Sequence, residues 1–262
     1  MPYVTRLTVD AERTRPFPYD VPAIRHARDL DLSAHVTFFV GDNGTGKLTL
    51  LESLAYRLGL ATMSGDGYRR TDFEAARKLR LALKLDRGID RDVGFFFRAE
   101  DFSDYLSSVR AADRNIRDSL RELEGEVPES VIREMQRSAN ARQRDMQSRF
   151  GQDLHAFSHG EAYLQIIEQR VRGRGIYLFD EPEAALSPAR QLSLIHYMRE
   201  HLARQHSQFI IATHSPIMLA FPQARLYEIT ADAMTECAYT DTEYYTITKS
   251  FLNYPELYLR EL

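Results

Sequence analysis

The chain has 262 residues, 44% of them hydrophobic, which is enough to bury a sizeable core as one large domain or as one domain carrying an insertion. Its 34 Lys and Arg residues against 38 Asp and Glu give a formal net charge of -4, which excludes the chain-wide basic surface that draws a protein to nucleic acid. The single cysteine, Cys237, excludes an internal disulfide framework and fits a reducing cytoplasm.

The N-terminal stretch, MPYVTRLTVDAERTR, lacks the apolar segment of a signal peptide. No run anywhere approaches the roughly 18 apolar residues that would span a bilayer. We therefore expect a cytoplasmic protein without direct membrane insertion, for which any role at a membrane would require a partner subunit.

Apolar runs of strand length recur along the chain, and helical patterns lie between them. Three runs, VTFFV, IYLF and FIIA, are continuously hydrophobic, as strands buried on both faces of a parallel sheet must be. Strands that alternate with helices predict an α/β fold with a layered sheet. The six expected strands begin at Val4, His35, Leu79, Val93, Gly175 and Gln208. The expected helices carry apolar stripes at Leu50, Leu51, Leu54, Ala55 and Leu58, and at Leu192, Ile195, Met198 and Leu202.

The segment 101–150 breaks this alternation, because it has no strand-like run and many Arg and Glu residues. We predict that it forms a helical subdomain inserted into a core of residues 1–100 and 151–262. Residues 133–149 hold five Arg against two acidic residues, which is either a solvated helix face or a weak nucleic-acid contact. After the sixth strand we expect two short strands joined by a turn at 231–233, and a closing helix capped by Asp241.

The stretch VGDNGTGK follows the second predicted strand and matches the phosphate-loop pattern G-x-x-x-x-G-K. Its glycines let the backbone curl around phosphates with N–H groups pointing inward, and Lys47 neutralises the outer phosphates. The N-terminus of the following helix adds a partial positive charge at the same place. The sequence therefore predicts a site for ATP. Its candidate binding residues are Gly41, Asp42, Asn43, Gly44, Thr45, Gly46, Lys47, Leu48 and Thr49.

Leu48 departs from the pattern, because the position after the lysine normally offers a Ser or Thr hydroxyl to Mg2+. Thr49 carries a hydroxyl, but one residue along a helix is a rotation of about 100°, which should point it away from the metal. We expect nucleotide binding to survive and metal-assisted hydrolysis to weaken.

The second element of the site is IYLFDE, an apolar strand that ends in Asp180 and Glu181. We expect Asp180 to hold Mg2+ through water, and Glu181 to orient or deprotonate the attacking water. The stretch FIIATHSP places His214 after another buried strand, where the imidazole can donate a hydrogen bond to a terminal phosphate. The candidate catalytic residues are therefore Glu181, His214 and Lys47.

The order of phosphate loop, FSHGEAYLQ, YLFDEPEAALS and ATHSP resembles the ABC-type ATPase superfamily, in particular its SMC-like branch and its small stand-alone bacterial members. The resemblance covers most of the chain and implies a P-loop NTPase fold. It also implies that a shortened signature segment binds the nucleotide held by a second copy, and that AALSP contacts this copy. The segment consists of Ser158, His159, Gly160 and Glu161.

Three departures from this family stand out: Leu48, the lack of an LSGGQ signature, and the RAEDF that follows VGFFF where the family has a glutamine. Arg98 or Glu100 would take the place of that glutamine. The resemblance implies an ATP-dependent homodimer that hydrolyses ATP–Mg2+ and drives partner release, with an unidentified protein partner. The alternatives are a nucleotide sensor with little turnover and the motor subunit of a transporter.

Overall fold

The computed structural model describes residues 2–10, 16–62, 74–89, 93–102 and 159–260, and the isolated positions 128, 134 and 137. The chain divides into two compact units, one made of Met1–Ala99 and Val171–Leu262 and the other of Glu100–Arg170. Our prediction of a core with a helical insert at 101–150 stays a prediction, because most of that insert lies outside the described residues.

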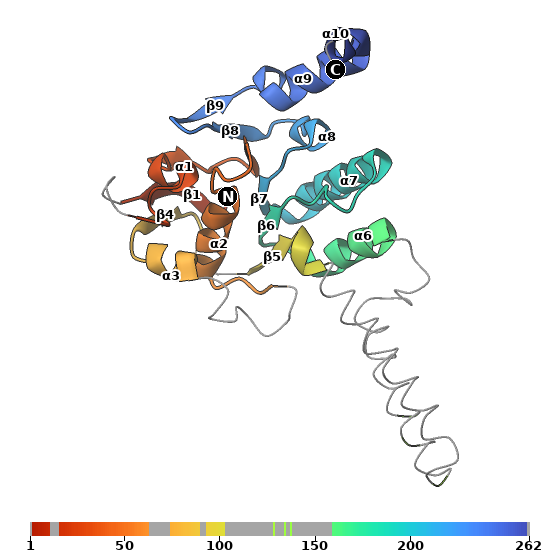
Figure 1. Cartoon of the computed structure of the whole chain (residues 1–262). Helices are drawn as coiled ribbons and strands as arrows, with labels where there is room; N and C mark the ends of the chain where they lie inside the picture. The colour runs from red at the N-terminus through yellow and green to blue at the C-terminus, as the bar shows by residue number, and fades with distance from the viewer. Residues whose placement is uncertain are drawn as a thin grey trace. The chain divides into compact units, whose positions relative to one another are not determined.

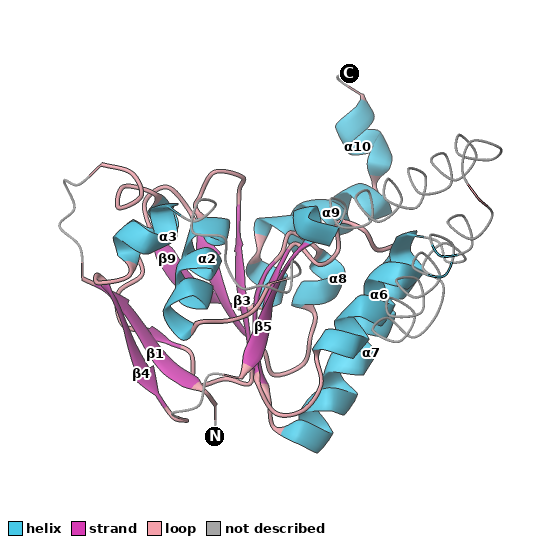
Figure 2. Cartoon of the chain, turned by 90° about the horizontal axis from the view of Figure 1, so that it is seen from below, coloured by secondary structure: helices cyan, strands magenta, loops and turns pink. Residues whose placement is uncertain are grey.

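A six-stranded sheet forms the centre of the first unit (Figures 1 and 2). In spatial order its strands are β5 (Gly94–Arg98), β6 (Ile176–Asp180), β7 (Gln208–Ala212), β3 (Val36–Gly41), β8 (Arg225–Ile229) and β9 (Met234–Cys237). All neighbours are parallel except β8 and β9. The three continuously hydrophobic runs are the adjacent strands β6, β7 and β3, and every residue of β3 and β7 is buried. The predicted α/β fold with a layered sheet is confirmed.

Helices cover both faces of this sheet. Figures 1 and 2 show α2 (Lys47–Leu58) on one side of β6 and β7 and α7 (Pro188–Gln205) on the other. The whole predicted stripe of α2 is buried. The predicted stripe of α7 is wrong in part, because Met198 is buried as predicted but Leu192 is 59% exposed. Besides Met198, the buried residues of α7 are Gln191, Leu194 and His201.

The burial of two polar residues explains why the buried face of α7 differs from the predicted one. His201 packs edge-on against the rings of Tyr177 and Phe209 and has Nε2 at 2.9 Å from the Ser207 hydroxyl. Gln191 donates to the carbonyl of Leu186. Because these polar groups find partners, the helix buries them in place of the more apolar stripe one residue further along.

A second, antiparallel sheet contains β2 (Leu30–Asp31), β1 (Val4–Val9) and β4 (Leu83–Arg87) in that order. The strand predicted from Leu79 begins four residues later, because Leu79 ends the helix α3 (Glu74–Leu79). Ala76 and Leu79 are the buried residues of α3, and their spacing of three fits a helix rather than a strand.

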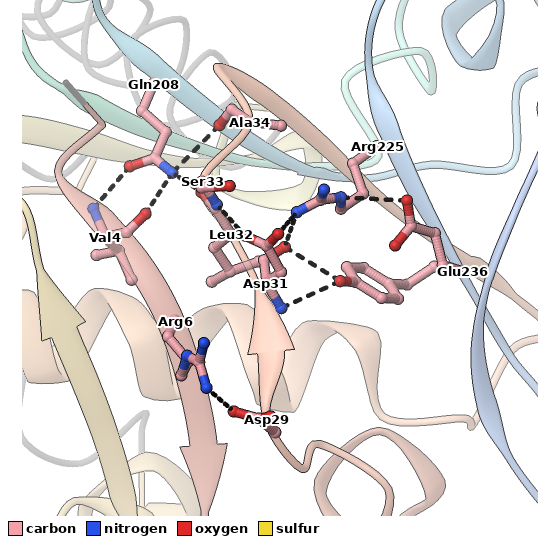
Figure 3. Close-up of polar contacts among 11 residues, drawn as sticks. Val4, Arg6, Asp29, Asp31, Leu32, Ser33, Ala34, Gln208, Arg225 and Glu236 are labelled. Carbon is pink, nitrogen blue, oxygen red and sulfur yellow. Dashed lines mark hydrogen bonds and ion pairs between the residues drawn. The ribbon is translucent and has the colours of Figure 1, made fainter.

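The buried side chain of Gln208 ties the two sheets together (Figure 3). Its Oε1 accepts from the backbone N–H of Tyr3 and Val4, each at 2.9 Å. Its Nε2 donates to the carbonyls of Val4 and Leu32 at 2.8 and 2.6 Å. A second link joins Arg225 of β8 to Asp31 of β2 by an ion pair (Figure 3).

The two short strands and the closing helix predicted near the C-terminus are present as β8, β9 and α9. Thr230 donates its N–H to Ala233 at 2.9 Å in the predicted turn between β8 and β9. The predicted cap of the closing helix is wrong, because Thr242 and not Asp241 precedes α9 (Glu243–Asn253) and accepts from the N–H of Tyr245. Asp241 ends a short 3-10 helix (Tyr239–Asp241). Neither α9 nor the following α10 (Pro255–Leu259) contains a buried residue.

The remaining described helices are short, apart from one in the second unit. They are α1 (Pro22–Arg25) and α8 (Pro216–Leu219) in the first unit and α6 (His159–Arg170) in the second. Within the second unit, the buried rings of Phe102 and Tyr163 meet edge to face at 4.8 Å between centroids. Among the described residues no helix is long and apolar enough to cross a membrane.

Candidate functional site

The phosphate loop connects β3 to α2, as the sequence predicts. Gly41, Gly44 and Gly46 all have positive φ, at 150°, 82° and 88°. A Cβ at Gly41 would lie 2.3 Å from the Ile229 carbonyl oxygen, and one at Gly46 would lie 2.7 Å from Val21 Cγ2. Two of the glycines are therefore required by the atoms packed against them, a backbone oxygen at Gly41 and the Val21 side chain at Gly46, and not only by conformation.

Lys47 is the first residue of α2, and only 6% of its surface is exposed. Its Nζ donates to the carbonyls of Gly41 at 2.5 Å and Asp42 at 3.0 Å, so the ammonium group curls back over the loop. Burial lowers the pKa of Lys47, and the nearby carboxylates of Glu181 and Asp180 oppose this shift. The residues of the two predicted sequence elements thus interact electrostatically in the folded chain.

Leu48 is half-buried and packs against the hydrophobic core of the first unit. Thr49 is also half-buried, and its carbonyl accepts from the Ser53 hydroxyl at 2.6 Å. The leucine therefore has an apolar environment of its own, which stabilises the start of α2 without offering an oxygen to a cation.

Asp180 ends β6, and Glu181 follows it with a φ of 47°, which non-glycine residues rarely adopt. Burial and, to a smaller extent, the adjacent Glu181 raise the pKa of Asp180, Lys47 and Arg98 act in the opposite direction, and the net result is a pKa of about 7. A buried carboxyl beside another carboxylate is costly to ionise unless a cation is near. The end of β6 is thus electrostatically suited to a divalent cation.

This pKa shift predicts a pH-dependent effect of Asp180→Asn on the metal-free protein. A carboxyl whose pKa rises from 3.8 to about 7 on folding stabilises the fold below its unfolded pKa, and the contribution is lost as pH approaches 7. The neutral variant should therefore be more stable, by about 2–4 kcal/mol at pH 8 and about 1 kcal/mol at pH 5. Urea unfolding at both pH values measures this difference. The exposed Asp232→Asn is the control, and an equal effect of Asp180→Asn at both pH values would contradict the assignment.

His214 follows β7 and lies beside Glu181, with 3.2 Å between Nε2 and a carboxylate oxygen. Burial lowers the pKa of His214, Lys47 lowers it further, and Glu181 and Glu183 oppose this. The predicted catalytic residues Lys47, Glu181 and His214 are therefore brought to one edge of the sheet, where the parallel strands β3, β6 and β7 end.

Three features of the site were not anticipated from the sequence. Glu183 accepts hydrogen bonds from the loop that carries His214. Arg98, one of the two predicted glutamine substitutes, pairs with Glu52 of α2 at 2.7 Å, and the two side chains are only 17% and 10% exposed. Tyr244 is the third. A carboxylate two residues after a DE pair is a signal that could have pointed to Glu183, whereas no pattern connects the C-terminal tyrosine to the loop.

Tyr244 of the C-terminal helix α9 contacts the phosphate loop. Its hydroxyl donates to the Asp42 carboxylate at 3.1 Å, and its ring lies 5.0 Å from that of His214. Partial burial and the hydrogen bond with Asp42 together raise the pKa of Tyr244 to about 12. A cavity of about 380 Å³ opens next to it, between the loop and the end of β8. Its lining comprises Pro22, Gly41, Asp42, Asn43, Gly44, Thr45, Glu228, Ile229, Thr230, Ala231, Glu243 and Tyr244.

The predicted signature segment falls at the edge of what the structure describes. Ser158 lies outside the described residues, and α6 begins at His159. Gly160 and Glu161 are therefore in the first turn of α6, and Glu161 places an acidic side chain there. This helix belongs to the second unit, whereas the phosphate loop belongs to the first.

A family model matches residues 69–220, more than half of the chain, and its description is "AAA domain, putative AbiEii toxin, Type IV TA system". The matched range begins after the phosphate loop and includes Asp180, Glu181 and His214. No curated protein matches the chain in sequence.

Among solved structures, two are examples of limited similarity to this chain. CbiO1 from Clostridium perfringens, part of the ABC transporter complex CbiONQ, has a TM-score of 0.47 and 16% identity over 100% of both chains. The Smc head domain from Pyrococcus furiosus, bound to the C-terminal domain of ScpA, has a TM-score of 0.48 and 13% identity over 98% of this chain and 100% of that one. With a family match over more than half of its length and a phosphate loop between β3 and α2, the chain belongs to this AAA-domain family of P-loop proteins.

Proposed function

We propose that the chain binds ATP–Mg2+ at residues 41–49 and hydrolyses it slowly at the interface of a head-to-tail homodimer. The observation that supports this most is that the phosphate loop after β3 lies at the same edge of the sheet as Asp180 and Glu181 at the end of β6. Cycles of closure and opening of the dimer would then act on a protein partner.

In this proposal Lys47 exchanges its two carbonyl partners for the outer phosphate oxygens of ATP. The exchange is favourable because a bond between an ammonium and a charged oxygen is roughly twice as strong as one to a neutral carbonyl. The backbone N–H groups at the start of α2 add further donors. Asp42, Asn43 and Gly44 are exposed and so remain accessible to the ligand.

Glu181 is proposed as the base that orients the attacking water and accepts its proton as the bond to the leaving ADP oxygen breaks. His214, 3.2 Å from Glu181, would donate from its ring to the terminal phosphate. Asp180 suits a role in holding Mg2+ through water, whereas Leu48 supplies no ligand, so the donor set fits the ion only in part. The chemistry that Mg2+ supplies when bound is neutralisation of charge on the phosphates.

The cavity beside the loop is proposed to receive the nucleoside. β3 lies between β7 and β8 in the sheet, and the carboxylates and His214 stand on the β7 side. A triphosphate whose end reaches those groups points its nucleoside to the opposite side, where the cavity opens beside Ile229 and Pro22. About 380 Å³ lies within the range of small-molecule sites.

The dimer is proposed from the family resemblance. In it, the segment from Ser158 to Glu161 of one copy would bind the ATP held by the other, with residues 184–188 at the contact. A helix N-terminus such as that of α6 offers N–H groups to an anion. ATP would thus hold the two copies together until hydrolysis removes the terminal phosphate.

A nucleotide sensor with little turnover is the second candidate, and the packing of Leu48 against the core favours it. In that case closure upon ATP binding would be the output, and reopening would depend on nucleotide exchange. The two candidates share the binding site and differ only in the rate of hydrolysis.

Sedimentation velocity with ATP–Mg2+ and with ADP–Mg2+ tests the proposed dimer. We expect a dimer with ATP and a monomer with ADP, because only ATP carries the phosphate that reaches the second copy. The double variant Leu48→Ser, Glu181→Gln should retain the ATP-bound dimer for longer, because it lacks the proposed base. A monomer at ATP concentrations that saturate the site by calorimetry would refute the dimer, and an absence of binding heat would refute the site itself.

A further inference from the structure

Glu183 lies in the turn between β6 and α7, two residues after Glu181. Hydrogen bonds from Ala184 N to the Glu181 carbonyl and from Leu186 N to the Glu183 carbonyl, at 3.0 and 2.8 Å, fold this turn tightly. The ends of β6 and β7 are neighbours, with Asp180 opposite Ala212. The side chain of Glu183 therefore starts close to the segment that follows β7.

One oxygen of Glu183 accepts three hydrogen bonds from consecutive residues of that segment. Oε1 lies 2.6 Å from the Thr213 hydroxyl, 2.7 Å from the backbone nitrogen of His214 and 3.2 Å from that of Ser215. Bonds to a charged acceptor are stronger than those between neutral groups. A single carboxylate thus connects the strand end that carries Glu181 to the loop that carries His214.

The donors have little access to water if this carboxylate is removed. Thr213 is fully buried, so its hydroxyl would lose its acceptor, whereas the N–H of Ser215 would keep a second acceptor in the Thr213 hydroxyl at 3.0 Å. Leaving buried donors unpaired costs free energy, so the segment would rearrange rather than stay in place. The bond to Glu183 thus holds the backbone of His214, whose ring lies 3.2 Å from Glu181.

The second oxygen, Oε2, is buried and has no hydrogen-bond partner among the described residues. A glutamine could accept the same three hydrogen bonds without a buried charge. The hydrogen bonds alone therefore do not explain why a charged residue stands at this position. The charge of Glu183 opposes the lowering of the His214 pKa by burial and by Lys47. It thereby favours a ring that can donate to a phosphate.

We propose that Glu183 is a positioning residue for ATP hydrolysis, which acts through His214 by fixing its backbone and by supplying a negative charge next to it. This inference rests on the proposed ATPase function. It adds that the side chain of Glu183 couples the turn after Glu181 to the loop that carries His214.

The test compares Glu183→Gln and Glu183→Asp in the Leu48→Ser background, with Leu48→Ser alone as reference and the exposed Glu200→Gln of α7 as matched control. We expect Glu183→Gln to lower kcat about fivefold with KM for ATP little changed, and Glu183→Asp to recover part of the loss. Adding His214→Ala should remove the effect of Glu183→Gln, since residues that act through one another are not additive. Equal effects of Glu183→Gln with and without His214 would overturn the proposal.

A measurement without nucleotide separates this inference from the ATPase function. In an NMR titration, the midpoint of the His214 ring should fall in Glu183→Gln and stay unchanged in Glu200→Gln. An unchanged midpoint in Glu183→Gln would overturn the proposal, even if the protein hydrolyses ATP. The expected fall would support the link even in a chain that shows no turnover.

Discussion

Replacing Lys47 with alanine is expected to weaken ATP binding about 100-fold or more, which corresponds to roughly 3 kcal/mol. The ammonium group is the only side-chain cation that the structure places against the loop carbonyls of Gly41 and Asp42 among the described residues. Charge-assisted bonds to phosphate are worth about 1.5–3 kcal/mol each, so the loss of two accounts for the size of the effect.

Isothermal titration calorimetry, with Mg2+ and with EDTA, measures this loss. Lys84→Ala is the control, because Lys84 is 65% exposed and pairs with Asp10 on the second sheet. The Lys47 effect should persist in EDTA, since it arises from direct contact with the phosphates. Native affinity in Lys47→Ala would place the nucleotide elsewhere.

Replacing Leu48 with serine is expected to raise kcat at least about 10-fold, because substitutions next to a bound metal ion typically change activity by about 10–100-fold. A serine at the start of α2 can offer its hydroxyl to the cation next to Asp180, which leucine cannot do. The change also removes packing from a half-buried position, so the free energy of unfolding should fall by about 1–2 kcal/mol.

Leu48→Ala separates the two possible causes of a gain in kcat. It removes as much packing as serine does but adds no oxygen. If leucine only lacks a ligand, alanine leaves kcat low while serine raises it. An equal rise in both variants would show that steric bulk limits turnover, and no rise in either would favour the sensor. Phosphate release at saturating ATP–Mg2+ is the measurement, and ATP affinity in EDTA should match the native chain in both.

The buried strands and the phosphate loop could be predicted because their patterns are local. β3, β6 and β7 are continuously apolar, and the spacing of Gly41, Gly46 and Lys47 follows from backbone geometry alone. The face of α7 could not be predicted in the same way. Leu192 and Met198 fit an apolar stripe, yet the buried position of His201 depends on Ser207 and on two rings from neighbouring strands.

The sequence by itself determined the α/β fold and pointed to Lys47, Asp180, Glu181 and His214 as candidate site residues, because each lies at or after the end of a buried strand and parallel strands bring such ends to one edge. Only the tertiary structure decided what surrounds them. Glu183 reaches His214 across 31 residues of sequence, and Tyr244 reaches Asp42 across 202. Such contacts leave no periodic signal in the chain, since they arise when separate strands and helices pack together and a side chain meets a buried donor or acceptor.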